Sequence, residues 1–203
     1  MKHARIRHHG QAVNVQVDDQ LRVTLPNGEV LQEREVEWLP PAQGTVFALG
    51  LNYADHASEL EFKAPEEPLV FLKAPNTLTG HRQVSVRPAG VEYMHYEAEL
   101  VAVIGKTARN VSREHAMEYV AGYTLCNDYA IRDYLENYYR PNLRVKSRDT
   151  LTPIGPYIVD RDDVADPHRL ALSTYVNGEL RQRGSTADMI FDIPFLVAYL
   201  SEF

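Results

Sequence analysis

The sequence predicts a mainly β protein with few helices, and three observations support this fold class. Residues 23–32 and 174–183 each place an Asn-Gly pair between two alternating runs, a strong β-hairpin signal. Most other apolar runs are short, rich in Val, Leu and Ala, and bounded by glycine or proline. Only two longer segments, 112–122 and 192–203, carry clear helix signals.

Length and composition indicate one globular domain with room for a small appendage. The chain has 203 residues, is 44% hydrophobic and carries a formal net charge of −7, which disfavours nucleic acid and anionic membranes as partners. No apolar run is long enough to span a bilayer. The single cysteine, Cys126, excludes an internal disulfide, so we expect a cytoplasmic protein in which this residue is a small buried hydrophobe.

The amino-terminal part of the chain is predicted to form a separate β-rich unit. It contains the hairpin at 23–32 and is followed by WLPPAQG (38–44), whose two prolines and glycine predict a linker. We therefore divide the chain into an appendage with its linker, residues 1–43, and a main body, residues 44–203.

The main body is predicted to alternate strands with polar connections. VFALGLNY (46–53), VFLKAP (70–75) and the segment 96–104 read as strands, and YTLCNDYAIRD (123–133) as a strand that runs into a polar loop. The segment ADHASEL (54–60) is predicted to be a short helix or turn.

Each of the two longer helical segments has a start signal. In 112–122, Ser112 is the expected N-cap, an apolar stripe follows, and Gly122 is the expected stop. In 192–203, Asp192 is the expected N-cap of an apolar helix.

Two carboxylates interrupt the apolar strand at 96–104. Successive side chains of a strand point to opposite faces, so Glu97 and Glu99 share one face, roughly 7 Å apart along the chain. Like charges so placed repel each other and lose hydration beside valines. A bound cation, paired basic residues or a strand end in water would each compensate them.

A third carboxylate, Asp128, stands at the end of the following strand. Glu97, Glu99 and Asp128 together would form an all-oxygen cluster, which suits Mg²⁺, Mn²⁺ or Ca²⁺ and leaves positions for water or substrate. The alternative, usual for an isolated Glu-x-Glu, is that both glutamates face solvent on an edge strand while Asp128 caps a turn.

Two further sets of polar residues are candidates for proton transfer and anion binding. His56 and Glu59 are three residues apart, so one helical turn would pair them as a general base; the alternative is a solvent-facing pair. Lys146 lies in the predicted polar loop RVKSRDTLTPIGP, where it would hold a carboxylate or oxyanion, or form part of a solvated charge run.

Several stretches in this order and spacing resemble the fumarylacetoacetate hydrolase family, from about residue 44 to the end of the sequence. They are GLNYADHASEL, FLKAPNTLTG, YEAELVAVIG, GYTLCNDYAIRD and RVKSRDTLTPIGP. Within the family the resemblance is closest to the bifunctional isomerase/decarboxylases of homoprotocatechuate (4-hydroxyphenylacetate) breakdown, for which IRDYLENYYRPNLRVKSRD is specific. Residues 1–43 resemble the small β appendage of single-unit members.

The resemblance implies a mixed β-sandwich roll that assembles as a homodimer and binds a small 2-oxo acid. It implies a divalent metal, Mg²⁺ first and Mn²⁺ or Ca²⁺ as alternatives, on Glu97, Glu99 and Asp128. It further implies roles for His56 with Glu59 in proton transfer, for Lys146 at a carboxylate or oxyanion, and for Lys73 and Arg132 at substrate carboxylates.

The implied activity is decarboxylation and isomerisation of 2-oxo or 2-hydroxy-dienoic di- and tricarboxylic acids, through an enolate that the metal stabilises. Two alternatives stay open: a C–C bond hydrolase acting on acylpyruvates or fumarylpyruvate, and a non-catalytic, incomplete subunit. The second arises because the family's last strands, with their glycine-threonine-proline loop, have no counterpart before Phe203. Open sheet edges and exposed apolar surface are therefore expected.

Overall fold

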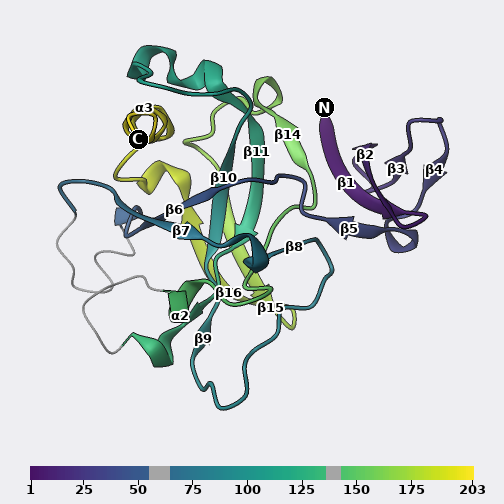
Figure 1. Ribbon diagram of the computed structural model, residues 1–203, viewed down its shortest axis with the longest axis horizontal. Coiled ribbons are helices and arrows are strands. Elements are labelled where there is room, and N and C mark those ends of the chain that lie inside the picture. Colours follow the sequence, from purple (N-terminus) through teal and green to yellow (C-terminus); the bar gives the residue numbers. More distant parts are fainter. Residues whose placement is uncertain (55–64, 136–142) are drawn as a thin grey trace.

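The computed structural model describes residues 1–54, 65–135 and 143–203, which form a molecule built mainly from short strands (Figure 1). This confirms the prediction of a mainly β fold. In the described parts the strands are β1 (Lys2–His8), β2 (Gln11–Val17), β3 (Val23–Thr24), β4 (Val30–Leu31), β5 (Glu37–Leu39), β6 (Val46–Gly50), β7 (Leu69–Lys73), β8 (Leu78–Thr79), β9 (Met94–His95), β10 (Ala98–Ile104), β11 (Val120–Asn127), β12 (Ala130–Ile131), β13 (Thr152–Pro153), β14 (Ile158–Asp160), β15 (Ala171–Val176) and β16 (Glu179–Ser185).

Helical structure is limited to short segments. The described α-helices are α2 (Leu143–Lys146) and α3 (Ile193–Leu200). The 3-10 helices are η1 (Glu33–Glu35), η2 (Pro75–Thr77), η3 (Arg113–Tyr119), η4 (Arg132–Tyr134), η5 (Arg161–Asp163) and η6 (Thr186–Asp188). Within these described segments, no helix is long and apolar enough to cross a membrane.

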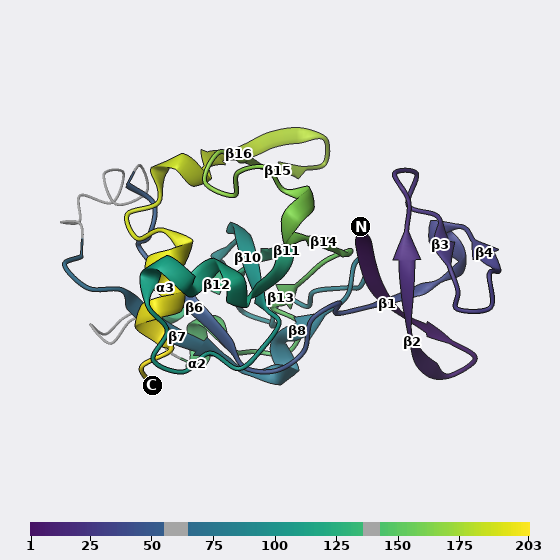
Figure 2. The same ribbon diagram turned by 90° about the horizontal axis from the view of Figure 1, so that it is seen from above.

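One eight-stranded sheet joins the amino-terminal strands to the centre of the molecule. Its order is β10-β11-β14-β1-β2-β3-β4, with β5 also paired to β1. Figure 2 shows β1 to β4 at one end of the molecule and β10 and β11 in its middle. The short strand β14 is the junction, because it pairs on one side with β11 and on the other with β1.

The amino-terminal strands enclose their own apolar cluster, which Ala4, Ile6, Val15, Val17, Val23, Leu25 and Trp38 form. Trp38 is 1% exposed, and its indole N–H donates to the backbone carbonyl of Glu33. The predicted linker at 38–44 is therefore wrong at its start. Trp38 and Leu39 belong to β5, which pairs with β1, because burying the indole draws this segment into the sheet.

Both predicted hairpins are confirmed. The strands β3 and β4 pair around Asn27-Gly28, and β15 pairs with β16 around Asn177-Gly178. In the second turn, Asn177 and Gly178 have φ values of 52° and 82°, the left-handed conformation that a tight hairpin turn requires.

The predicted strands of the main body are present but shorter. The strands β6, β7 and β10 lie within or near the predicted ranges 46–53, 70–75 and 96–104. The range 123–133 contains most of β11, then β12 and η4. Most of the predicted helix or turn at 54–60 lies outside the described residues.

The helix predicted at 112–122 is present only in part, with Ser112 at its N-cap position as expected. Residues Arg113–Tyr119 form a 3-10 helix, and the Ser112 side chain makes no capping hydrogen bond. Gly122 does not stop a helix; it pairs with β10 and β14 inside β11. A Cβ at this position would lie 2.2 Å from the carbonyl oxygen of Val159, so the glycine permits the close approach of β14.

The predicted helix at 192–203 is confirmed as α3, which ends at Leu200. The Asp192 carboxylate accepts a hydrogen bond from the Phe195 N–H at 2.9 Å, as an N-cap does. The helix packs on η3 through an apolar cluster of Ala116, Val120, Tyr123, Ile193 and Val197.

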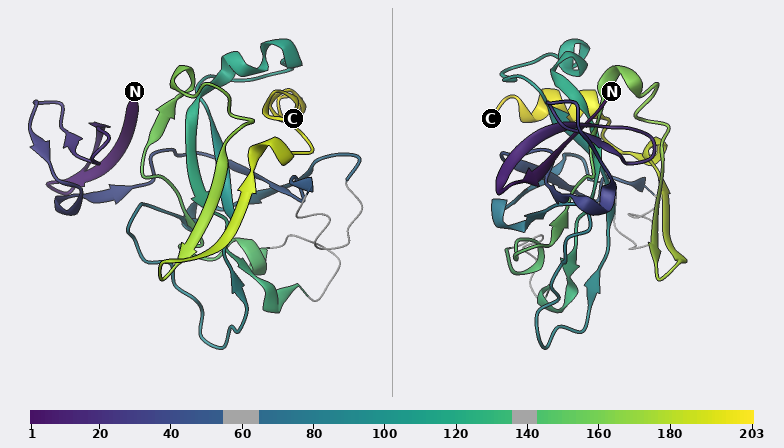
Figure 3. Two further views of the ribbon diagram at one scale, coloured as in Figure 1. Left: turned by 180° about the vertical axis from the view of Figure 1, so that it is seen from behind. Right: turned by 90° about the vertical axis from the view of Figure 1, so that its right-hand side faces the viewer.

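The strand β10 is the terminal strand of its sheet, so one of its edges pairs with no strand of the described parts. The β15–β16 hairpin lies beside β10, as the rear view in Figure 3 shows. This arrangement determines which side chains reach the start of β10.

Candidate functional site

Charged side chains gather where β10 begins and β11 ends. Ala98 pairs with Asn127 in the ladder between these strands, and the Asp128 N–H donates to the Glu97 carbonyl oxygen at 2.8 Å. These contacts hold Glu97 and Asp128, which are distant in sequence, at the same end of the two strands.

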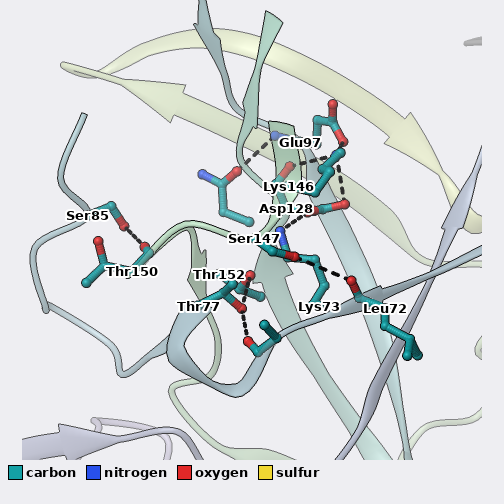
Figure 4. Close-up of polar contacts among 12 residues, drawn as sticks. Leu72, Lys73, Thr77, Ser85, Glu97, Asp128, Lys146, Ser147, Thr150 and Thr152 are labelled. Carbon is teal, nitrogen blue, oxygen red and sulfur yellow. Dashed lines mark hydrogen bonds and ion pairs between the residues drawn. The ribbon is translucent and has the colours of Figure 1, made fainter. Parts of the chain in front are cut away.

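Lys146 bridges these two carboxylates (Figure 4). Its Nζ lies 2.5 Å from Glu97 Oε2 and 2.9 Å from Asp128 Oδ2, and it also donates to the Asp128 carbonyl oxygen at 3.2 Å. The alternative in which Lys146 belongs to a solvated charge run is wrong. Lys146 ends the helix α2 and is 6% exposed, because the two carboxylates replace its hydration.

Two more cations contact the same carboxylates. Lys73, at the end of β7, lies 2.6 Å from Asp128 Oδ1 and is 3% exposed. Burial lowers the pKa of the Lys73 ammonium, Asp128 opposes that shift, and Lys146 adds to it. Arg132 Nη2 lies 2.6 Å from Glu97 Oε1 and is partly buried. Neither cation is a fully exposed surface ion pair.

Glu99 differs from its two neighbours. No cation of the described residues lies within ion-pair distance of it. Burial raises the pKa of Glu99 to about 8, and the carboxylates of Glu97 and Asp128 add to this effect. At neutral pH the protonated form of Glu99 is therefore favoured.

The structure therefore brings together six of the eight predicted site residues: Glu97, Glu99, Asp128, Lys146, Lys73 and Arg132. The alternative in which the glutamates face solvent and Asp128 only caps a turn is wrong, since Asp128 is 6% exposed and bound by two lysines. The remaining two, His56 and Glu59, lie outside the described residues.

The chemistry of the three carboxylates suits a hard divalent cation, which prefers oxygen ligands. Among the described residues, no three acidic, histidine or cysteine side chains already surround one point at which an ion would sit. Lys146 instead occupies one oxygen of Glu97 and one of Asp128. Glu99 has no cation partner among the described residues, and a bound ion would favour its carboxylate form over the protonated form.

Two side chains that sequence reasoning missed hold the backbone of this segment. Asn127 Oδ1 accepts the Glu97 N–H at 2.8 Å, and Gln182 Oε1 accepts the Ala98 N–H at 2.9 Å. The position of Asn127 next to Asp128 was a usable signal. No local signal in the sequence marks Gln182, because its partner Ala98 lies 84 residues away.

Comparisons with known proteins agree on the family. Residues 45–203 match the fumarylacetoacetate (FAA) hydrolase C-terminal family. A 4-hydroxyphenylacetate degradation bifunctional isomerase/decarboxylase of Salmonella dublin is 74% identical over 175 residues, covering 86% of this chain and 41% of that protein. The chain thus spans less than half the length of this curated relative.

Solved structures cover nearly the whole chain. A 5-carboxymethyl-2-hydroxymuconate delta-isomerase from Mycobacterium smegmatis is 33% identical with a TM-score of 0.85, covering 99% of this chain and 81% of that one. A maleylpyruvate hydrolase from Sphingobium sp. SYK-6, in complex with manganese (II) ion and pyruvate, is 25% identical with a TM-score of 0.82, covering 99% of this chain and 83% of that one. The family match and these likenesses show that the chain belongs to the fumarylacetoacetate hydrolase family.

Proposed function

We propose that this chain is a metal-dependent decarboxylase and isomerase of 2-oxo or 2-hydroxy-dienoic di- and tricarboxylic acids in 4-hydroxyphenylacetate (homoprotocatechuate) catabolism. The observation that carries the proposal is the cluster of three carboxylates and three cations at the start of β10. The 74% identity to a bifunctional isomerase/decarboxylase supports the reaction class and the pathway.

Glu97, Glu99 and Asp128 are the proposed ligands of a divalent ion, with Mg²⁺ the expected metal. The manganese in the maleylpyruvate hydrolase supports a divalent ion, and Mn²⁺ is the natural probe for it. When bound, such an ion acts as a Lewis acid that draws electron density toward the 2-oxo group of the substrate.

Charge balance favours a substrate with several carboxylates. Two carboxylates, Glu97 and Asp128, face three cations, and the raised pKa of Glu99 favours its neutral form at pH 7, so these side chains without metal carry a net positive charge. A divalent ion then adds two positive charges, which a di- or tricarboxylate offsets. Lys73 and Arg132 are proposed to hold substrate carboxylates, and Arg132 offers the bidentate geometry that this requires.

Lys146 is proposed to stabilise the negative charge that develops on the substrate oxygen. Its Nζ lies between Glu97 and Asp128, so it is held beside the proposed ligands. An ammonium group that is fixed in a site with little water stabilises such negative charge more strongly than an ammonium group in solution. Proton transfer is assigned to His56 with Glu59, which remains a prediction from the sequence.

The second candidate function is C–C bond hydrolysis of an acylpyruvate or fumarylpyruvate. The likeness to a maleylpyruvate hydrolase favours it. Hydrolysis needs a base to deprotonate water, and general base catalysis contributes ~10²–10⁴-fold. Decarboxylation needs no attacking water, so the two reactions depend differently on His56.

Product analysis tests the proposal. Chelator-stripped protein is supplied with Mg²⁺ or Mn²⁺ and offered 5-oxopent-3-ene-1,2,5-tricarboxylate or an acylpyruvate. We expect metal-dependent release of CO₂ that persists in His56→Ala and disappears in Glu99→Ala. Cleavage of the acylpyruvate without CO₂ release, lost equally in both variants, would establish the hydrolase instead. Turnover of neither substrate would overturn both.

We also propose that the chain forms a homodimer, as the family resemblance implies. Exposed apolar side chains on β6, β7 and β10, among them Phe47, Leu72 and Ile104, support burial against another surface. Sedimentation equilibrium of the purified protein measures the assembled mass, and a monomer at micromolar concentration would contradict the dimer.

A further inference from the structure

The backbone N–H of Ala98 lies between the two glutamates that are proposed to bind the ion. Ala98 separates Glu97 from Glu99, and β10 has no strand of the described parts on its second edge. Alternate N–H groups of an edge strand point away from the sheet and need another acceptor. The Ala98 N–H donates to Gln182 Oε1, on β16, at 2.9 Å.

Thr174 orients the Gln182 side chain. The two residues face each other across the β15–β16 hairpin, and the Thr174 hydroxyl donates to the same Oε1 atom at 3.0 Å. Both side chains are partly buried, whereas Ser173 and Arg183, the next opposed pair, are exposed. Two donors that converge on one oxygen determine which end of the amide faces β10.

The other edge of the same segment is also fixed. Asn127 Oδ1 accepts the Glu97 N–H, and the Glu97 carbonyl oxygen accepts the Asp128 N–H, each at 2.8 Å. The segment Glu97–Glu99 is thus held from β11 on one side and by Gln182 on the other. Loss of Gln182 would leave only the first of these restraints.

We propose that Gln182, oriented by Thr174, is a positioning residue that fixes the backbone between Glu97 and Glu99 so that both carboxylates are presented to a divalent ion. The inference rests on the proposed metal site. Residues that orient metal ligands without touching the ion typically change metal affinity or activity by about 10–100-fold when they are mutated.

A purely structural role would give a different result. If Gln182 only attaches the hairpin to the sheet, its loss lowers the melting temperature and leaves the affinity of the folded protein for the ion unchanged. A positioning role lowers the affinity while the metal-free protein keeps its fold.

The experiment compares Gln182→Leu, Thr174→Val and Thr174→Ser with the control Arg183→Leu, an exposed position next to Gln182 on the same strand. Thr174→Val removes the hydroxyl with little change of shape, and Thr174→Ser retains it. Each variant is measured for the melting temperature without metal, the Kd for Mn²⁺, the electron paramagnetic resonance spectrum of bound Mn²⁺, and the hydrogen exchange rate of the Ala98 amide.

We expect Gln182→Leu to weaken Mn²⁺ binding by about tenfold or more, to alter the Mn²⁺ spectrum and to accelerate exchange at Ala98. Thr174→Val should act in the same direction with a smaller effect, and Thr174→Ser and Arg183→Leu should match the unsubstituted protein. If Gln182→Leu does not fold, the comparison of Thr174→Val with Thr174→Ser decides.

An unchanged Mn²⁺ affinity in folded Gln182→Leu, or in Thr174→Val where the first does not fold, would overturn the positioning role while leaving the metal site intact. Failure of the unsubstituted protein to bind Mn²⁺ would instead overturn the metal site, and the positioning role with it. The two failures are therefore distinguishable in one series.

Discussion

The two ends of the large sheet are stabilised in opposite ways. Around β1 to β5, the buried side chains are apolar, and Ile6 and Trp38 are 0% and 1% exposed. At the start of β10, two buried lysines, Lys73 and Lys146, contact carboxylates. Apolar burial stabilises a fold directly, whereas the desolvation of buried ions offsets most of their attraction. The residues of the charged end are thus best explained by a role in binding or reaction, and those of the apolar end by their contribution to the stability of the fold.

The largest effect on stability is expected at the apolar end. Trp38→Ala should lower the free energy of unfolding by about 3–5 kcal/mol, because it removes a large buried side chain and leaves a cavity. Denaturant unfolding measures this change. Mn²⁺ affinity of the folded variant should equal that of the unsubstituted protein, and a large loss of affinity would show that the two ends are not independent.

The second effect comes from metal at the charged end. An ion that binds only the folded protein stabilises it by about 2.7 kcal/mol when its concentration is a hundredfold above Kd. Millimolar Mg²⁺ or Mn²⁺ should therefore raise the melting temperature of chelator-stripped protein by several degrees. Monovalent salt at equal ionic strength is the control, and an equal shift with it would contradict a specific site.

A smaller effect is expected for Lys73→Met. The change removes the hydrogen bond to Asp128 Oδ1, but Lys146 still contacts Oδ2. We therefore expect a loss of about 1 kcal/mol in the free energy of unfolding, near the lower end for a buried polar group that loses one partner. A loss as large as that of Trp38→Ala would mean that the ion pairs stabilise the fold as much as the apolar core does.

The smallest effect on stability is expected for Glu99→Gln. Burial and the neighbouring carboxylates raise the pKa of Glu99 to about 8, so the side chain is mainly neutral at pH 7. Replacing it with a neutral amide should therefore leave the metal-free protein unchanged or slightly more stable. The same change should abolish the metal-induced rise in melting temperature. Clear destabilisation together with retained metal binding would assign Glu99 a structural role.

Local signals were enough for the elements that depend on neighbouring residues. The Asn177-Gly178 turn and the Asp192 cap were predictable because the residues that form them lie within a few positions of each other. The predicted helix at 112–122 was wrong at its carboxyl-terminal end because Val120 and Gly122 pair with β10, a contact that no local pattern reveals.

The residues of the candidate site also differ in whether local sequence patterns could predict them. The spacing of Glu97 and Glu99 in a strand predicted that they share one face, whereas their grouping with Asp128 followed from the family resemblance. The burial of Lys73 was not predictable, since its partner Asp128 lies 55 residues away in the sequence. Gln182 was missed for the same reason, because its contact depends on how the hairpin lies against β10.

The short strand β14 has a consequence for how the molecule opens. It pairs with β11 and with β1 through two residue pairs each, so a narrow ladder joins the two ends of the sheet. Each end has its own apolar cluster, and in addition to this ladder the Glu33 carboxylate contacts His81 and Arg82 of the main body. The amino-terminal strands and the β10–β11 region are therefore expected to behave as two cooperative unfolding units, in which the first can fluctuate while the second keeps its cluster of charged side chains assembled.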